Sequence, residues 1–300
     1  AQPAAPDPST TTLDAVNGWT LRLPTLQRGF VSNLDRVSRF GIGAIGTESL
    51  CVRAYPTYRL NVGWYLDWSA SRTPRRPGGI SFAHLITLYQ DKAPSPSGSA
   101  LDAVVRANPG ALWLIGNEPD SPLKDAVTPA RYAELYHDLY YQIKGVDPTA
   151  VLSAGGIAQP TPLRIRYLEA ALAAYRADYG TKMPVDVWNT HAYILPEIPM
   201  EEAAGRPSAF LPVGISDAAN EKHLFELEDH ANVGIIQDMI RRFREFMDRN
   251  GYRERPLIIT ETGFILGWQE LYPDQQTADA HILAFMDELI GYLLTATDAE

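Results

Sequence analysis

Short apolar runs alternate along this chain, from about residue 38 onward, with longer stretches in which apolar residues recur at three- and four-residue steps. Runs of a few consecutive apolar residues predict strands that are buried on both faces, and the longer periodic stretches predict amphipathic helices. This alternation predicts βα units that build a parallel sheet. The expected strands are Phe40–Ile45, Leu60–Leu66, Phe82–Tyr89, Ala111–Asn117, Ala150–Ala154, Val185–His191 and Leu257–Glu261.

Four of the intervening helices have clear signatures. Thr128 is an N-cap residue followed by Pro129, which is favoured at the first helical position, and this helix is expected to extend to about Ile143. Gly251 follows the third helix where a left-handed cap is expected. The aromatic and methionine stripes of these helices predict core packing rather than ligand binding. The other three helices are expected near Pro162–Tyr179, Val233–Asn250 and Thr277–Leu294.

The fold class expected from this order is α/β, a (β/α)8 TIM barrel, because barrels of about 250 residues are commonly one domain. We expect residues 1–18 to be a flexible linker and residues 19–300 to form the barrel, with a long loop at about 194–231 above the catalytic face. Only seven strands are found. The sequence stops where the eighth would begin, so we expect truncation there, with Gly18–Leu23 as the alternative strand that completes the sheet.

The composition limits the kinds of molecule that this protein is expected to bind. A net charge of −10 argues against a nucleic-acid or anionic-membrane surface, and no apolar stretch approaches the ~18 residues of a membrane helix. Cys51 is the only cysteine and the six histidines lack metal-ligand spacing, so no disulfide, metal or other cofactor is expected. The Pro-rich start of the chain resembles the segment after a cleaved secretory signal, which predicts a secreted protein; trimming of the chain is the alternative. We also expect a monomer.

Two glutamates follow apolar, strand-forming runs. Glu118 ends Trp113-Leu-Ile-Gly-Asn and precedes Pro119, which cannot continue the sheet, and Glu261 ends Leu257-Ile-Ile-Thr. Active sites of parallel barrels lie at the carboxyl ends of the strands, so both carboxylates are expected at that end. Because Leu257 and Ile259 share the parity of Glu261, strand alternation predicts that Glu261 points into the barrel.

Such a pair has a known chemical use. Cleavage of a glycosidic bond with retention needs one carboxyl group to protonate the leaving oxygen and a second, ionised one to attack the anomeric carbon, roughly 5 Å away. Mutual repulsion is expected to raise one pKa and to keep that group protonated near neutral pH.

The two motifs, Asn117-Glu118-Pro119 and Thr260-Glu261-Thr-Gly263, resemble those of clan A of the retaining glycoside hydrolases. The resemblance implies a (β/α)8 barrel, Glu118 as general acid/base, Glu261 as nucleophile, and Asn117 as the residue that binds the sugar 2-hydroxyl. It also implies that Tyr193 contacts the nucleophile and that His191 lines the pocket. Gly116-Asn-Glu-Pro-Asp is similar to the Phe-Asn-Glu-Pro-Asp signature of small β-1,3-glucanase families, with glycine in place of phenylalanine.

Aromatic side chains offer flat faces to the apolar faces of sugar rings. Trp64 and Trp268, close to the ends of the second and seventh strands, are the expected platforms, and Tyr65 and Trp68 lie near the first of them. Trp113 and Trp188 are expected in the core. The leading hypothesis is thus a retaining glycoside hydrolase that acts on β-linked poly- or oligosaccharides. A non-catalytic carbohydrate-binding barrel and a transglycosylase are the alternatives.

Overall fold

A computed structural model describes residues 40–44, 51–205, 207–221, 225–264 and 272–295, and these residues form two compact units. The first unit contains the described residues up to Asp67 together with Arg75–Ser81. The second contains Trp68–Pro74 and the described residues from Phe82 onward. Residues 1–18 and the alternative strand Gly18–Leu23 lie outside the described residues.

The first unit has two short parallel strands, β1 (Gly41–Gly43) and β2 (Trp64–Leu66). Gly41 lies opposite Trp64, and a Cβ atom on Gly41 would come within 2.3 Å of the indole ring, so only glycine allows this contact. The expected strand Leu60–Leu66 begins late because its first residue ends a helical turn. The unit also contains η1 (Val52–Ala54), α1 (Thr57–Leu60) and η2 (Pro77–Gly79).

The second unit contains five parallel strands that pair in chain order. They are the predicted strands with small shifts of their ends; in the two largest, the third strand ends three residues early, at Ile86, and the fifth extends three residues further, to Ile157. The strands are β3 (Ser81–Ile86, from Phe82 in this unit), β4 (Leu112–Asn117), β5 (Val151–Ile157), β6 (Val187–Ala192) and β7 (Leu257–Thr262).

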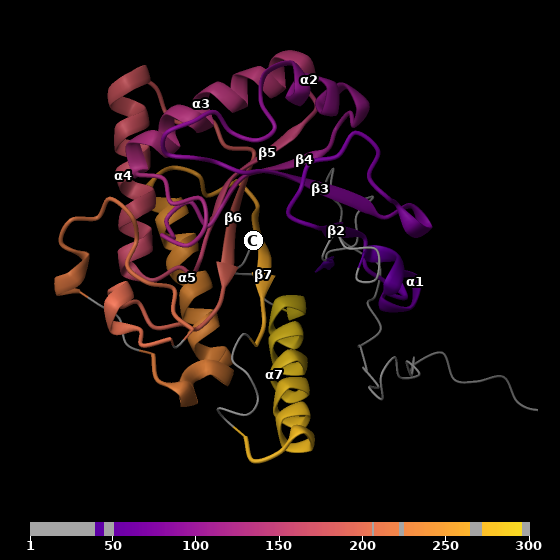
Figure 1. Cartoon of the computed structure of the whole chain (residues 1–300), viewed down its shortest axis with the longest axis vertical. Coiled ribbons are helices and arrows are strands. Elements are labelled where there is room, and N and C mark those ends of the chain that lie inside the picture. Colours follow the sequence, from indigo (N-terminus) through magenta and orange to yellow (C-terminus); the bar gives the residue numbers. More distant parts are fainter. Residues whose placement is uncertain (1–39, 45–50, 206, 222–224, 265–271, 296–300) are drawn as a thin grey trace, which may run out of the picture. The chain divides into compact units, whose positions relative to one another are not determined.

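Helices connect these strands and lie along their outer side (Figure 1). Thr128 caps the second of them, because its Oγ1 accepts a hydrogen bond of 3.4 Å from Arg131 N, and Pro129 is its first residue. Gly251 has the expected left-handed backbone, with a φ of 74°. The helices are α2 (Gly98–Ala107), α3 (Pro129–Val146), α4 (Pro162–Tyr179), α5 (Val233–Arg249) and α7 (Gln275–Thr295).

The expected long loop is the segment between β6 and α5, and its described residues contain only short helical turns: η3 (Met200–Glu202), η4 (Ala218–Asn220) and η5 (Leu227–Ala231).

The main core of the second unit lies between the outer side of the strands and the helices. Trp113 and Trp188 are both completely buried there, as predicted. Trp188 packs edge-to-face against Phe243 and Phe246 of α5, with ring centroids 5.9 and 5.2 Å apart. The helical stripes are thus core residues, and they fix the strands whose ends position the polar groups described below.

Parallel strands that follow one another in chain order, with helices between them, define the (β/α)8 barrel class, as predicted. Seven strands of this pattern are present in the described residues.

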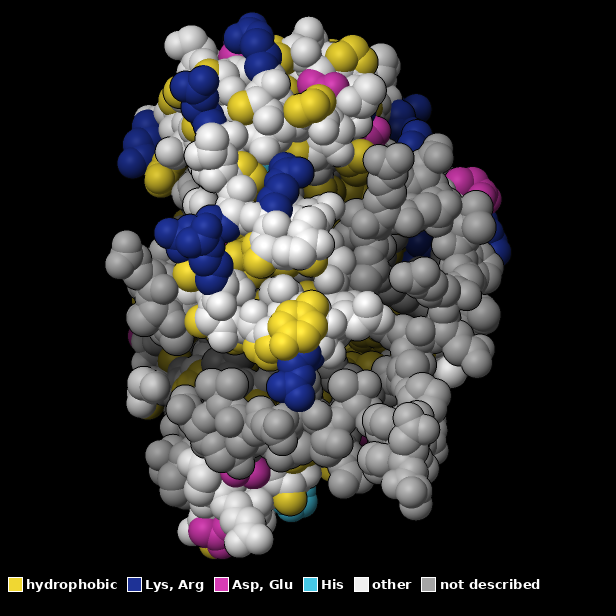
Figure 2. All heavy atoms as spheres, turned by 90° about the vertical axis from the view of Figure 1, so that its right-hand side faces the viewer, with side chains coloured by type: hydrophobic (Ala, Val, Ile, Leu, Met, Phe, Trp, Pro, Cys, Tyr) yellow, Lys and Arg dark blue, Asp and Glu magenta, His cyan; other side chains and the backbone are white. Residues whose placement is uncertain are grey.

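Two surface properties bear on partners. Within the part of the chain that the structure describes, none of the helices combines the length and the apolar character needed to cross a bilayer. On the face shown in Figure 2, Lys and Arg side chains are separated from one another rather than gathered in one basic patch.

Substitutions at two glycines test how closely the sheet is packed. A Cβ atom on Gly155 in β5 would lie 2.4 Å from Ile115 O and 2.8 Å from the hydroxyl of Tyr132, whereas one on Gly145 in α3 meets nothing within 4 Å. We expect Gly155→Ala to lower the free energy of unfolding by about 1–3 kcal/mol through overpacking. Gly145→Ala should instead raise it by about 0.4–1 kcal/mol. Denaturant unfolding of both variants measures the difference, and equal effects would contradict this packing.

Candidate active site

Glu118 directly follows β4 in a conformation that few residues adopt. Its φ is 46°, in the left-handed region, which costs free energy for a residue other than glycine and is frequent at functional sites. Its backbone N–H donates to Gly156 O of β5 at 3.0 Å, and the residue is buried, with 8% exposure. The backbone therefore turns sharply at the end of β4 and places this carboxylate at the carboxyl end of the strand.

The carboxylate of Asp125 stabilises the turn at the end of β4. Asp125 Oδ2 accepts hydrogen bonds from Asn117 N at 2.8 Å and from Leu88 N, just after β3, at 3.1 Å. Burial raises the pKa of Asp125 to about 7, although these two hydrogen bonds oppose the shift. Asp125 thus ties the loop after β3 to the end of β4.

Glu261 reaches the same region through an irregularity in β7. Leu257 and Ile259 pack against the apolar cluster of α5 and α7, on the outer side of the sheet. Strict alternation would therefore send Glu261 outward, so the parity argument from the sequence was wrong. The register with β6 shifts between Thr190, which pairs with Ile259, and His191, which pairs with Glu261. The extra residue, Thr260, turns Glu261 to the inner side.

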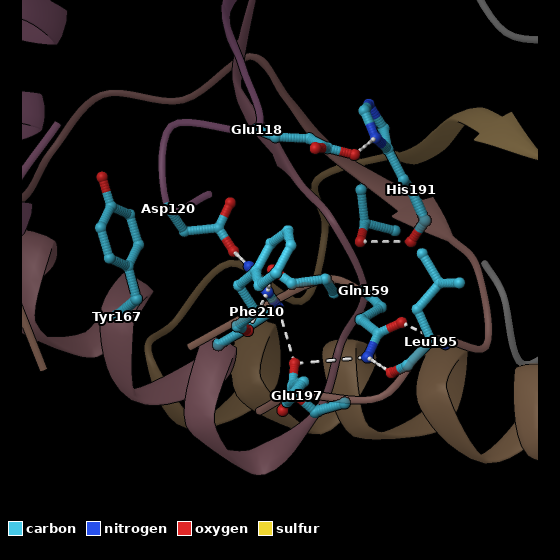
Figure 3. Close-up of polar contacts among 12 residues, drawn as sticks. Glu118, Asp120, Gln159, Tyr167, His191, Leu195, Glu197 and Phe210 are labelled. Atoms are coloured by element: carbon cyan, nitrogen blue, oxygen red, sulfur yellow. Dashed lines mark hydrogen bonds and ion pairs between the residues drawn. The ribbon is translucent and has the colours of Figure 1, made fainter. Parts of the chain in front are cut away.

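His191 of β6 contacts both glutamates, and Figure 3 shows its ring turned toward Glu118. Its Nδ1 is 3.0 Å from Glu118 Oε1, and its Nε2 is 3.5 Å from Glu261 Oε1. One oxygen of each carboxylate and one imidazole nitrogen all lie within 4.8 Å of one another. The imidazole is 2% exposed. The strand ends of β4, β6 and β7 thus bring together three groups that are far apart in the sequence.

Two further donors bind Glu261. The indole Nε1–H of Trp68 donates to Oε1 at 2.5 Å, and the hydroxyl of Tyr193 donates to Oε2 at 3.2 Å. Burial, with the charge of Glu261 next, raises the pKa of Tyr193, so its hydroxyl keeps its proton and remains a donor. Both oxygens of Glu261 are therefore held in a defined orientation.

The charges of this site differ from the sequence-based expectation. Burial by itself would raise the pKa of Glu118, but the hydrogen bond and charge of His191, followed by the charge of Arg164, outweigh it and lower that pKa. Burial would lower the pKa of His191, yet the charge of Glu261 and the hydrogen bond and charge of Glu118 raise it. The expected raised pKa is therefore not found on Glu118, because the hydrogen bond and charge of His191 outweigh the effect of burial.

In the structure each carboxylate contacts a different nitrogen of the imidazole, Glu118 through a hydrogen bond and Glu261 at ion-pair distance. Among the described residues, this is the group whose ligand atoms are close enough to consider for a cation.

The other residues selected from the sequence are placed as follows. Asn117 is the last residue of β4 and half-buried, next to Glu118. Trp64 belongs to the first unit, where it packs on Gly41, and its role as a sugar platform stays a prediction. Trp268 lies outside the described residues. Trp68 was not chosen from the sequence as a site residue. The signal that could have indicated this role was its position shortly after the second strand, next to an aspartate.

Sequence reasoning also missed a buried ionic cluster next to Glu118. Arg164 of α4 is fully buried, and its Nε donates to Glu197 Oε1 at 2.6 Å while its Nη1 donates to Asp120. Its Nη2 donates to the carbonyl oxygens of Ala209 and Phe210, the latter at 2.8 Å. Arg164 therefore joins the loop after β4 to the long segment after β6, and Figure 3 shows its partners Asp120, Glu197 and Phe210 gathered around one place.

The opposite charges in this cluster favour the ionised form of each partner. Burial raises the pKa of Asp120, and the charge of Arg164 opposes that shift. The pKa of Arg164 is raised, because its two carboxylate partners outweigh the effect of burial. Since Asp120 is two residues from Glu118, this ion pair helps to fix the backbone that presents the candidate catalytic carboxylate.

Comparison with known proteins identifies similar folds. No family model and no curated protein matches the sequence. A GH128 (subgroup I) endo-beta-1,3-glucanase from Amycolatopsis mediterranei, in complex with laminaritriose, has a TM-score of 0.54 at 18% identity, over 86% of this chain and 84% of that one. A mutant of that enzyme, in complex with laminaritriose and laminaribiose, has the same score and identity over 87% and 85%. At this identity the similarity establishes a shared fold.

The Arg164 cluster predicts an asymmetric stability effect. Arg164→Met should lower the free energy of unfolding by about 3–5 kcal/mol, because two buried carboxylates lose their counter-charge. Arg166, two residues further along α4, pairs with Asp217 and Glu221 at the surface. Arg166→Met should cost less than about 1 kcal/mol. Denaturant unfolding of both variants tests this prediction. Similar losses of unfolding free energy would show that the buried cluster contributes no more to stability than the surface ion pairs.

Proposed function

We propose that this protein is a retaining glycoside hydrolase that cleaves β-glycosidic bonds of poly- or oligosaccharides by double displacement. The observation that supports this best is the approach of Glu118 and Glu261, whose nearest carboxylate oxygens lie within 4.8 Å. Retaining enzymes separate the two carboxyl groups by about 5–5.5 Å, and inverting ones by about 6.5–9.5 Å to make room for a water molecule. The short spacing favours retention.

Glu261 is suited to the role of nucleophile. Its oxygens accept hydrogen bonds from Trp68 and Tyr193, and donors of this kind stabilise the ionised form of a carboxylate. They also orient the attacking oxygen, which reduces the entropic cost of reaching the anomeric carbon.

Glu118 is suited to the role of acid/base. It faces Glu261 across the site, and its bond to His191 connects it to a group that exchanges protons near neutral pH. In the first step Glu118 protonates the leaving oxygen while Glu261 forms the glycosyl ester. In the second step Glu118 accepts a proton from the water that hydrolyses this ester.

For the substrate we propose β-1,3-linked glucan oligosaccharides as the first class to test. The solved structures of the same fold include an endo-beta-1,3-glucanase with bound laminaritriose. The Gly116–Asp120 motif, which resembles that of small β-1,3-glucanases, points to the same class. Trp68 offers an aromatic face beside Glu261, with 36% of the residue exposed, and such faces suit the apolar faces of sugar rings.

A covalent label tests the nucleophile. Incubation with activated fluorosugars should add one glycosyl unit at Glu261, detected by mass spectrometry of peptides, because the intermediate is an ester of this carboxylate. Glu261→Gln should remain unlabelled. Binding of laminarin oligosaccharides without any label would favour a non-catalytic barrel, whereas labelling combined with longer rather than shorter products would indicate a transglycosylase.

Leaving-group dependence tests the acid. Glu118→Ala should lower kcat/KM by ~100-fold or more for substrates with poor leaving groups, because these need a proton in the transition state. Activated aryl glycosides, which need none, should lose much less in the glycosylation step. Glu245→Ala, at an exposed position of α5, is the matched control and should affect neither class. Equal losses for both substrate classes would rule out the acid role of Glu118.

A further inference from the structure

The imidazole of His191 makes both of its polar contacts to carboxylates. Nδ1 lies 3.0 Å from Glu118, and Nε2 lies 3.5 Å from Glu261. A neutral imidazole has only one N–H and would present a lone pair to one of these oxygens. A protonated imidazole donates to Glu118 and holds its second N–H at ion-pair distance from Glu261, so the contacts on the two sides of the ring favour the cation.

The groups that face His191 are acidic or neutral. Glu118 directly follows β4, Glu261 comes from β7, and Tyr193 directly follows β6, with its ring edge-to-face at 6.1 Å. On the side of β5 lies Gly156, where a Cβ atom would stand 2.9 Å from Nε2, so no side chain separates the ring from this strand.

The next charged groups compensate each other. Asp120 adds negative charge near His191, but it is paired with Arg164. Within the described residues, His191 is therefore the cation that directly contacts the two carboxylates.

We propose that His191 stores the proton that Glu118 delivers to the leaving group, so that His191 and Glu118 act as one acid. This inference rests on the proposed glycosidase function. In the free site Glu118 is ionised and the proton resides on the imidazole. The opposite shifts of the two pKa values, lowered for Glu118 and raised for His191, support this distribution.

The proton balance closes over one catalytic cycle. When substrate displaces water, the Nδ1 proton moves 3.0 Å to Glu118 Oε1, which leaves a neutral imidazole with its remaining proton on Nε2. Glu118 passes that proton to the glycosidic oxygen as the bond breaks and the oxygen of Glu261 bonds to the sugar. In the second step Glu118 takes a proton from the attacking water, Glu261 is released as carboxylate, and the proton returns to Nδ1.

Another buried histidine in the same unit provides a contrast. His230 has Nδ1 at 3.2 Å from the carbonyl oxygen of Ile194, and burial lowers its pKa. His191 is equally buried, so the opposite direction of its shift comes from the carboxylates and not from burial.

Nitrogen-15 NMR of the imidazoles, on the unliganded full chain, tests the stored proton directly. Signals are assigned by replacing each histidine in turn. We expect both nitrogens of His191 to be protonated at pH 6.5 and to titrate at a higher pH than those of His230. A neutral His191 at this pH, with one unprotonated nitrogen, would overturn the proposal. This readout requires no catalytic activity, so it is independent of whether the protein is a glycosidase.

The pH profile of kcat/KM tests the use of the proton. His191→Asn keeps an N–H donor for Glu118 but cannot store a proton. We expect the alkaline limb of the kcat/KM profile of this variant, measured with a substrate that has a poor leaving group, to lie about one pH unit or more below that of the wild type. The reason is that a carboxyl group then has to hold the proton that the imidazole held. His137→Asn, on α3 where its ring bonds to Tyr175, is the control and should keep the profile of the wild type.

The outcomes separate the two proposals. Failure of the wild-type protein to hydrolyse any glycan, together with absence of labelling at Glu261, overturns the proposed function. Hydrolysis by the wild type together with the same alkaline limb in His191→Asn overturns only the proton store and shows that His191 serves as a simple donor. A shifted limb together with a protonated His191 supports it.

Discussion

Two like charges held a few ångströms apart in a buried place require a compensating positive charge, and this requirement organises the site. Parallel strands direct their carboxyl ends to one side of the sheet, so β4 and β7 bring Glu118 and Glu261 to the same place. Without a counter-charge, one of them would have to take up a proton. His191 from β6 supplies that charge and contacts both carboxylates. Its position between them explains why the pKa of Glu118 is lowered even though its side chain is buried.

The loops around this centre are held by the same kind of interaction. Asp125 accepts backbone hydrogen bonds from the segments after β3 and β4, and Arg164 joins Asp120 to Glu197 and to the long segment after β6. Breaking such a buried network exposes unsatisfied groups to an apolar surrounding, which costs far more than the loss of a surface pair. Loops without regular secondary structure are thereby made rigid enough to present Glu118, whose left-handed backbone has to be maintained by its neighbours.

The prediction for Glu261 shows where pattern reasoning reaches its limit. The strand and its terminal glutamate were found from the sequence, and the side chain does lie on the inner side. The reason was nevertheless wrong, because Leu257 and Ile259 face the helices and an extra residue in β7 turns Glu261 inward. A bulge of this kind depends on pairing with β6, which apolar periodicity within β7 does not report. The raised pKa expected for a carboxyl failed for a similar reason, since it required knowledge of which group stands between the two.

Local patterns in the sequence determined the elements of this protein. Apolar runs, the cap formed by Thr128 and Pro129, and the glycine at 251 specify strands and helices through interactions between near neighbours. Seven strands and four helices were therefore predicted, and the largest error is the start of β2, placed four residues too early. The tertiary structure alone decided which side chains meet. The contacts of His191 with two carboxylates, of Trp68 with Glu261, and of Arg164 with Asp120 and Glu197 join residues that are 33 to 193 positions apart in the sequence. Contacts of that range arise from strand register and loop conformation, which are properties of the packed molecule.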